Sequence, residues 1–202
     1  MHKIETSKKE IIDILKAWIV ISVAFAVILG TRNIFSIKFL FYLIISALTV
    51  GVGFLFHELA HKVLAQKYGA IAEFRSFDIM LVLALALAFF GSPIIFAAPG
   101  AVMISGGNIN VQRYGKISAV GPLTNIILAI IFLALRRFFD GGSWLMELSN
   151  YGFLINSWLA LFNMIPIWEF DGRKIFQWSK AVWASIVLIG LFFFIYLRNI
   201  FF

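Results

Sequence analysis

Long apolar segments separated by short charged stretches constrain this 202-residue chain more than any other feature of its sequence. Hydrophobic residues make up 62% of the chain and charged residues only 13%, whereas a soluble domain is about half apolar. A helix needs about 20 apolar residues to cross a bilayer, and each apolar segment comes near that length. The segments are 17–30, 34–56, 79–98, 117–135, 151–168 and 181–197. The sequence therefore predicts an all-α polytopic membrane protein, with about five full transmembrane helices and a re-entrant apolar hairpin.

Composition also limits the chemistry and the partners of the chain. There is no cysteine, which excludes Cys-based zinc sites, disulfides and thiol catalysis, so any metal must be held by His and carboxylate groups. The net charge of +7 comes from Lys and Arg residues that flank the apolar segments, as topology signals do. We therefore expect the lipid bilayer, and no nucleic acid, as a partner, and the sequence indicates no oligomeric state.

Residues 57–61 read His-Glu-Leu-Ala-His, at the end of the apolar segment that begins at Phe39. Residues four apart lie on one face of a helix, so the imidazoles of His57 and His61 can reach one metal ion, with Glu58 close beside them. Ionisable groups inside an apolar span are costly and usually mark function. This pattern predicts a zinc site of the kind found in zinc peptidases.

A catalytic zinc site usually has three protein ligands, and the only other histidine in the chain is His2. The third ligand should therefore be Asp or Glu. Asp171 is favoured because Pro166 interrupts the apolar run before it and Gly172 lets the backbone turn beside the carboxylate. Glu169 is the leading rival. The remaining downstream candidates are Glu73, Asp78, Asp140 and Glu147.

The topology of segment 79–98 decides whether such a site can assemble. Gly91-Ser92-Pro93 lies in the middle of this segment and favours a turn. A segment that dips in and returns places twelve of the 17 Lys and Arg residues on one side of the membrane, whereas a single crossing places ten there. His57 and Asp171 each lie about 27–30 Å along their helices, so they meet only if those helices run parallel. We predict a re-entrant hairpin or two crossings, but not one.

The stretch 101–111 differs from its surroundings, because two short runs flank Gly106-Gly107, a recognised hairpin signal. It predicts a short β-hairpin near the active site, and a plain polar loop is the alternative. A hairpin here could offer an edge on which an extended substrate pairs as a strand.

Three motifs in order give the chain a specific resemblance to the site-2 proteases, zinc metalloproteases that cut peptide bonds within the membrane. The first is His57-Glu58-x-x-His61. The second is Asn163-x-x-Pro166 followed by Asp171-Gly172, and the third is Gly121-Pro122-Leu123-Thr124-Asn125. The match covers about residues 39–175 of a single membrane-embedded domain, 1–202, and leaves the accessory helices 17–30 and 181–197 outside it.

The resemblance implies that His57, His61 and Asp171 ligate one Zn²⁺ per chain. It also implies that Glu58 is the general base and that Asn163 contacts the substrate or the developing oxyanion. Candidate substrate-binding residues are Asn125, Gly106 and Gly107, although for Asn125 a structural role, capping or cross-linking helices, is favoured.

The predicted function is an intramembrane zinc endopeptidase that cuts a membrane-protein substrate whose helix can unwind locally. It is a multi-pass protein with its active site near the cytoplasmic side, where Lys62, Lys67 and Arg173 lie. One alternative is a zinc-binding membrane scaffold or transporter without hydrolysis. Another is a membrane-anchored peptidase acting on soluble segments, although the Glu-x-x-x-Asp/Glu pattern common in such enzymes is missing after His61.

Overall fold

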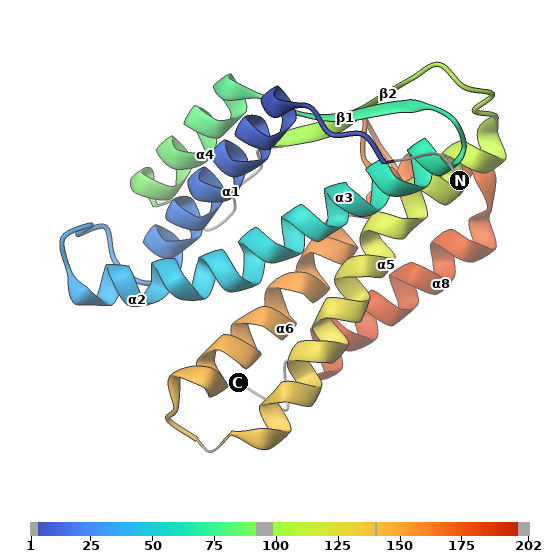
Figure 1. Ribbon diagram of the computed structural model, residues 1–202. Coiled ribbons are helices and arrows are strands. Elements are labelled where there is room, and N and C mark those ends of the chain that lie inside the picture. Colours follow the sequence, from blue (N-terminus) through green and yellow to red (C-terminus); the bar gives the residue numbers. More distant parts are fainter. Residues whose placement is uncertain (1–3, 92–98, 140, 198–202) are drawn as a thin grey trace.

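The computed structural model describes residues 4–91, 99–139 and 141–197, and these form helices around one two-stranded sheet (Figure 1). The strands are β1 (Ile71–Ser76) and β2 (Gly100–Ser105). The α-helices are α1 (Lys8–Leu29), α2 (Ile37–Ser46), α3 (Val52–Lys67), α4 (Asp78–Phe90), α5 (Val111–Leu135), α6 (Trp144–Asn163), α7 (Asp171–Trp178) and α8 (Lys180–Leu191). Short η segments extend them: η1 (Ala47–Gly51), η2 (Arg136–Phe138) and η3 (Phe192–Leu197).

Three helical stretches are long and apolar enough to cross a membrane, namely Lys8–Leu29, Ile37–Lys67 and Val111–Phe138. Two further apolar helices, Asp78–Phe90 and Lys180–Ile195, are shorter. The predicted crossing at 151–168 falls on α6, which begins and ends earlier and carries several Asn and Ser side chains along its 20 residues. The membrane-helical class is therefore supported, while a full set of five spans stays a prediction.

The stretch 37–67 is one continuous helix with a π-helical turn, η1, at its centre. The indole Nε1 of Trp18 on α1 donates a hydrogen bond to the carbonyl of Ala47 at 3.1 Å. Gly51 permits this contact, because a Cβ there would lie 2.5 Å from the same indole nitrogen. His57 lies 20 residues after Ile37, about 30 Å along the helix. The motif 57–61 thus lies near the far end of a membrane-length helix.

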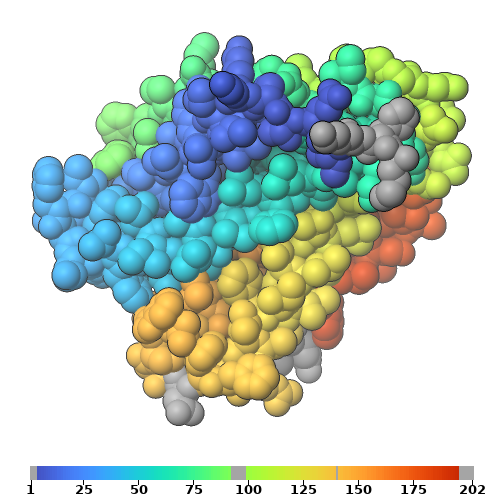
Figure 2. Space-filling model, viewed as in Figure 1, coloured from blue at the N-terminus to red at the C-terminus, as the bar shows by residue number. Residues whose placement is uncertain are grey.

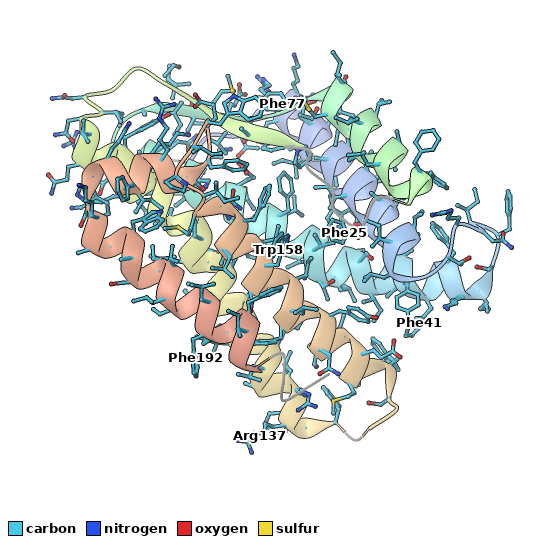
Figure 3. The ribbon with its side chains drawn as sticks, turned by 180° about the vertical axis from the view of Figure 1, so that it is seen from behind. Phe25, Phe41, Phe77, Arg137, Trp158 and Phe192 are labelled. Carbon is cyan, nitrogen blue, oxygen red and sulfur yellow. The ribbon has the colours of Figure 1, made fainter. Side chains whose placement is uncertain are left out.

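Helix α5 lies at the centre of the fold and packs against α3, α6 and α7. It runs away from the sheet, whereas α3 and α6 run toward it, so α3 and α6 are parallel to each other (Figure 1). Seen from behind, Phe77 lies at the sheet end of the molecule and Arg137 at the opposite end, beside the connection between α5 and α6 (Figure 3). The apolar residues Ala119, Ile126, Ala160, Met164, Ile175 and Ile186 form the cluster that joins these helices to α8.

The β-hairpin predicted within 101–111 is not formed. Strand β2 instead pairs antiparallel with β1, in a register that sets Ile71 opposite Ser105 and Ser76 opposite Gly100. Gly106 and Gly107 do have positive φ values of 68° and 70°, as the Gly-Gly signal requires. They lead into α5, however, and not into a second strand. The local sequence thus predicted the backbone conformation of the two glycines. It did not predict the partner of β2, because that partner, β1, lies about 30 residues earlier in the chain.

The segment between β1 and β2 leaves the sheet and returns to the same place. Ser76 and Gly100 are opposite each other, and the amide of Phe77 donates to the carbonyl of Pro99 at 3.0 Å. Helix α4, with 13 residues, is about 20 Å long, too short to cross a bilayer alone. The return leg includes residues 92–98, which lie outside the described residues, so re-entry or double crossing stays a prediction. A segment that crossed the membrane once would have its two ends on opposite sides, whereas Phe77 and Pro99 lie side by side.

Candidate metal centre

Three potential metal ligands converge where α3, α5 and α7 meet. His57 and His61 lie one turn apart on α3, and their rings approach edge to face with centroids 4.6 Å apart. Oδ2 of Asp171, the first residue of α7, lies 3.1 Å from Nε2 of each histidine. One ligand atom from each residue lies within 4.8 Å of the others, so this group could hold a metal ion.

Hydrogen bonds to the far side of each ring determine which nitrogen faces the centre. Nδ1 of His61 lies 2.6 Å from the carbonyl of Ile117, which can only accept, so this nitrogen carries the hydrogen. Nδ1 of His57 lies 2.6 Å from Oδ1 of Asn125. The Asn125 amide group donates to the Gly53 carbonyl and to Oδ1 of Asn156, each at 3.1 Å, which leaves its oxygen to accept from His57. Both Nε2 atoms therefore present lone pairs.

Gly121 gives the two rings the space that they occupy. It lies on α5, and a Cβ at this position would come 2.4 Å from Nε2 of His61 and 2.6 Å from Nε2 of His57. These are the two nitrogens that face Asp171. The neighbouring Pro122 is buried inside the continuous helix α5. The backbone of α5 is thus in direct contact with the proposed ligand atoms.

Asp171 is brought to the histidines by a compact turn between α6 and α7. Contrary to the prediction, Pro166 does not interrupt a helix, since α6 already ends at Asn163. The turn is held by the indole of Trp183, which donates to the carbonyl of Met164 at 2.8 Å. Gly172 allows α7 to start against this turn, because its Cβ would lie 2.2 Å from the same carbonyl oxygen.

The electrostatics of Asp171 keep the carboxylate available as a ligand. Burial alone would raise the pKa of Asp171, but when the Nε2 atoms of the neighbouring imidazoles are protonated, their positive charge and hydrogen bonds outweigh burial and lower this pKa well below its usual range. Asp171 also begins a helix, where unpaired amides favour negative charge.

The donor set fits zinc. Tetrahedral Zn²⁺ with bonds of about 2.0–2.2 Å places its ligand atoms about 3.3 Å apart, close to the 3.1 Å between Oδ2 and each Nε2. The Nε2 lone pairs of the two histidines and the carboxylate oxygen of Asp171 point toward one another. A cation bound between them would stabilise this arrangement.

Glu58, between the two histidines, is tied to the sheet. Its Oε2 accepts a hydrogen bond from the amide of Val102 on β2 at 3.1 Å. Val102 lies opposite Phe74 in the sheet. The amide of Phe74 donates to the carboxylate of Glu10 and not to β2, so Phe74 and Val102 form a non-hydrogen-bonded pair, in which both amides point away from the partner strand. The Glu58 carboxylate therefore faces the outer edge of β2.

A protein of Methanocaldococcus jannaschii named "Putative zinc metalloprotease MJ0611" is 43% identical to the chain over 183 residues, which cover 90% of the chain and 91% of that protein. The chain belongs to this zinc metalloprotease family. A second relative from the same organism, "Zinc metalloprotease MJ0392", is 32% identical over 130 residues, which cover 62% of the chain but only 31% of that protein. No family model and no solved structure gives a significant match.

In this member of the metalloprotease family, the residues predicted to contact the substrate lie apart from one another. Asn125 is fully buried behind His57, where its side chain bonds to His57, Gly53 and Asn156. The amide of Asn163 donates to the carbonyl of Leu159 within α6 at 2.9 Å. Gly106 and Gly107 lie on the exposed loop after β2, where Gly107 packs against the backbone of Ala70. Their roles in substrate binding stay predictions.

Two features of the site were missed by sequence reasoning. Asn156, fully buried on α6, orients Asn125 and in turn donates to the carbonyl of Gly152 at 2.9 Å. Strand β1 was not predicted, although it holds β2 beside Glu58. Asn156 could have been predicted as functional, because an Asn within an apolar helix usually has a polar partner there. The six residues of β1 carry no clear alternating pattern.

Asn125→Ala is expected to weaken zinc binding about 10- to 100-fold, because His57 would lose the acceptor that fixes its tautomer and ring orientation. Competition for zinc against a chelator of known affinity measures this change. Thr124→Ala is the matched control, since the Thr124 hydroxyl bonds only the carbonyl of Val120 in its own helix. Equal zinc affinity in both variants would contradict the role given to Asn125.

Proposed function

We propose that the chain is a multi-pass intramembrane zinc endopeptidase of the site-2 protease type, which hydrolyses peptide bonds in or next to transmembrane segments of other proteins. The observation that carries the proposal is the position of the ligand group. His57 and His61 lie on a 31-residue helix that is long and apolar enough to cross a membrane, and Asp171 reaches them from a separate helix. The relationship to a named zinc metalloprotease supports the same chemistry.

In this proposal His57 and His61 hold one zinc ion through Nε2, and Asp171 holds it through a carboxylate oxygen. When bound, zinc would supply a Lewis acid for the scissile carbonyl and lower the pKa of water to about 7. The acceptors Asn125 and the Ile117 carbonyl keep both imidazoles in the ligating tautomer.

Glu58 is proposed as the general base. Its carboxylate takes a proton from the attacking water and delivers it to the leaving amine nitrogen. Asn163 is proposed to donate a hydrogen bond to the developing oxyanion, which requires its amide to leave the carbonyl of Leu159. Glu58 lies on α3 between the two histidines, and Asn163 is the last residue of α6, before the turn that leads to Asp171.

The outer edge of β2 is proposed to hold the substrate in extended form. A helical substrate hides its peptide bonds, so the scissile segment must unwind and find new backbone partners. Val102 already directs its amide to Glu58, and alternate residues of β2 direct their backbone groups to the same edge. A strand paired there would lie beside the proposed base.

The sheet end of the molecule is proposed to face the cytoplasm. The segments at or near this end are the first half of α1, the end of α3, β1, the start of α5, α7 and the start of α8 (Figure 1). Their described basic residues are Lys8, Lys9, Lys16, Lys62, Lys67, Arg75, Arg113, Lys116, Arg173, Lys174 and Lys180. The segments toward the opposite end, around the start of α2 and between α5 and α6, carry Arg32, Lys38, Arg136 and Arg137. The positive-inside rule then places the ligand group near the cytoplasmic surface.

Glu58→Gln is expected to lower the rate of cleavage of a transmembrane reporter protein about 100- to 10,000-fold, because the substrate water loses its proton acceptor. Zinc content should stay that of the wild type, since Glu58 is not a proposed ligand. Cleavage is followed by gel with the purified protein in lipid vesicles, and zinc by elemental analysis. Unchanged biological activity of this variant would instead favour a scaffold or transporter that binds zinc without hydrolysis.

A further inference from the structure

A charged pair is completely buried next to the metal centre and takes no part in the mechanism above. Nζ of Lys62 lies 2.6 Å from Oε2 of Glu10, and their side chains are 1% and 0% exposed. Lys62 follows directly after His61 on α3, whereas Glu10 lies in the first turn of α1. Burying two charges costs more than it gains unless every other polar partner is satisfied as well.

Those further partners are present. Nζ of Lys62 also donates to Oγ1 of Thr6 at 2.7 Å. The second oxygen of Glu10, Oε1, accepts the amide hydrogen of Phe74 on β1 at 3.0 Å. We call this set the buried clamp: Thr6, Glu10, Lys62 and the Phe74 amide. It joins α1, α3 and β1 at one point. In the space-filling view the dark blue α1 lies against the teal α3 (Figure 2).

The buried clamp is connected to Glu58 through the sheet. Phe74 and Val102 are opposite each other in the register, and the amide of Val102 donates to Glu58. Glu58 and Lys62 are also four residues apart on one face of α3. Two carboxylates, Glu10 and Glu58, thus hold the two outward amides of one strand pair, one on each side of the sheet.

The same face of α3 continues to Gln66, which holds the next part of the strand. Its amide donates to the carbonyl of Ala72 at 2.9 Å and to that of Glu5 at 3.0 Å. The outer edge of β1 is therefore occupied by α3 and the N-terminal segment. The sheet can be displaced only if these contacts break.

We infer that Glu10 is a positioning residue for catalysis, which sets the place of β2 against Glu58 by holding the Phe74 amide, with Lys62 as its counter-ion. The inference rests on the proposed function, because the rate that it controls is peptide hydrolysis. It assigns a catalytic consequence to α1, the accessory helix outside the motifs that resemble the site-2 proteases.

Two double variants, both without the buried charges of Glu10 and Lys62, measure the effect of the hydrogen bond that the Phe74 amide donates to residue 10. Glu10→Met/Lys62→Met has no acceptor for the Phe74 amide, whereas Glu10→Gln/Lys62→Met keeps an amide oxygen at that place. Uncharged replacements of similar volume are tolerated where a single unpaired charge is not. The Met/Met variant is expected to lower kcat about 10- to 100-fold at unchanged zinc content, and the Gln/Met variant to regain most of that loss.

Hydrogen exchange of the amides in residues 71–76 and 100–105 gives a readout that does not need activity. Exchange should be about tenfold faster or more in the Met/Met variant than in the Gln/Met variant, with α5 unchanged. The control is Lys16→Met/Asp78→Asn, which removes an ion pair between α1 and α4. Asp78 accepts from the hydroxyl of Ser76 on β1, a hydrogen bond that the oxygen of Asn can keep, and the described contacts of this pair include no strand amide. This control should leave both kcat and strand exchange as in the wild type.

Equal kcat in the two double variants would overturn the inference, whether both are slow or both are as fast as the wild type. Faster strand exchange with unchanged kcat would overturn it as well. If Met/Met fails to fold, the Gln/Met variant decides alone, because loss of cleavage in that variant at full zinc content contradicts the inference. A wild-type protein without zinc-dependent cleavage would instead refute the proposed function, while the exchange data would still report on the clamp.

Discussion

Asp171→Ala is expected to reduce bound zinc from about one ion per chain to a small fraction of that, with loss of all peptide cleavage. The remaining two imidazoles on one helix cannot supply the three protein ligands usual in a catalytic zinc site. Elemental analysis of the purified protein after dialysis against a weak chelator measures the content. This is the largest effect that we expect from a single substitution.

The matched control for this experiment lies two residues away. Glu169, the rival ligand in the sequence, has a side chain that is 79% exposed and lies 3.9 Å from Nζ of Lys174. Glu169→Ala should therefore keep full zinc content and activity. Zinc that persists in Asp171→Ala but disappears in Glu169→Ala would show that the carboxylate ligand has been misassigned.

Gly121→Ala is expected to lower zinc affinity by about 100-fold or more, at the upper end of what changes next to the ligands cause. The added methyl group would lie 2.4–2.6 Å from the Nε2 atoms of both histidines. Neither ring can simply turn away, because His57 is held by Asn125 and His61 by the Ile117 carbonyl. The substitution therefore acts at the ligand atoms themselves.

Thermal unfolding with and without zinc separates this effect from general destabilisation. Gly121→Ala should lose most of the rise in Tm that zinc gives the wild type, since only the folded state binds the ion tightly. Gly141→Ala serves as the control, because a Cβ at that position has open space around it. A normal zinc-dependent rise in Gly121→Ala would mean that the backbone of α5 gives way and the contact is not critical.

The parts of the site that depend on local spacing could be predicted from the sequence, and the parts that depend on pairing could not. His57 and His61 share a helix face because of their four-residue spacing alone. A carboxylate as third ligand was predictable because the chain has no Cys and only His2 besides the pair, and Asp171 was favoured among six carboxylates by its sequence context and by the resemblance to the site-2 proteases. The role of Gly121 was not predictable, because it depends on how closely α5 approaches α3, a distance that no spacing along the chain encodes.

Long-range pairing also explains the errors. Gly106-Gly107 adopts the left-handed conformation that the hairpin signal implies, yet α5 follows it, with Asn110 capping the helix by accepting from the amide of Arg113. Lys62 was interpreted as one of the basic residues that mark the cytoplasmic side, and its side chain is in fact buried against Glu10 of the N-terminal helix. A lysine at a helix end is ordinarily solvated, and only the tertiary partner changes that expectation.

The π-helical turn η1 has a consequence for how a single helix serves two sets of neighbours. Such a turn contains one more residue than a regular α-helical turn, so the residues after it face about 100° away from where an unbroken α-helix of the same residue number would place them. If the same residues were wound as regular α-helix with none removed, the paired imidazoles would turn off the face that meets α5, while α2 stayed packed on α1. The short segment 47–51, which carries no chemistry of its own, therefore sets the angle between the face of α2 that packs on α1 and the face of α3 that carries the two histidines.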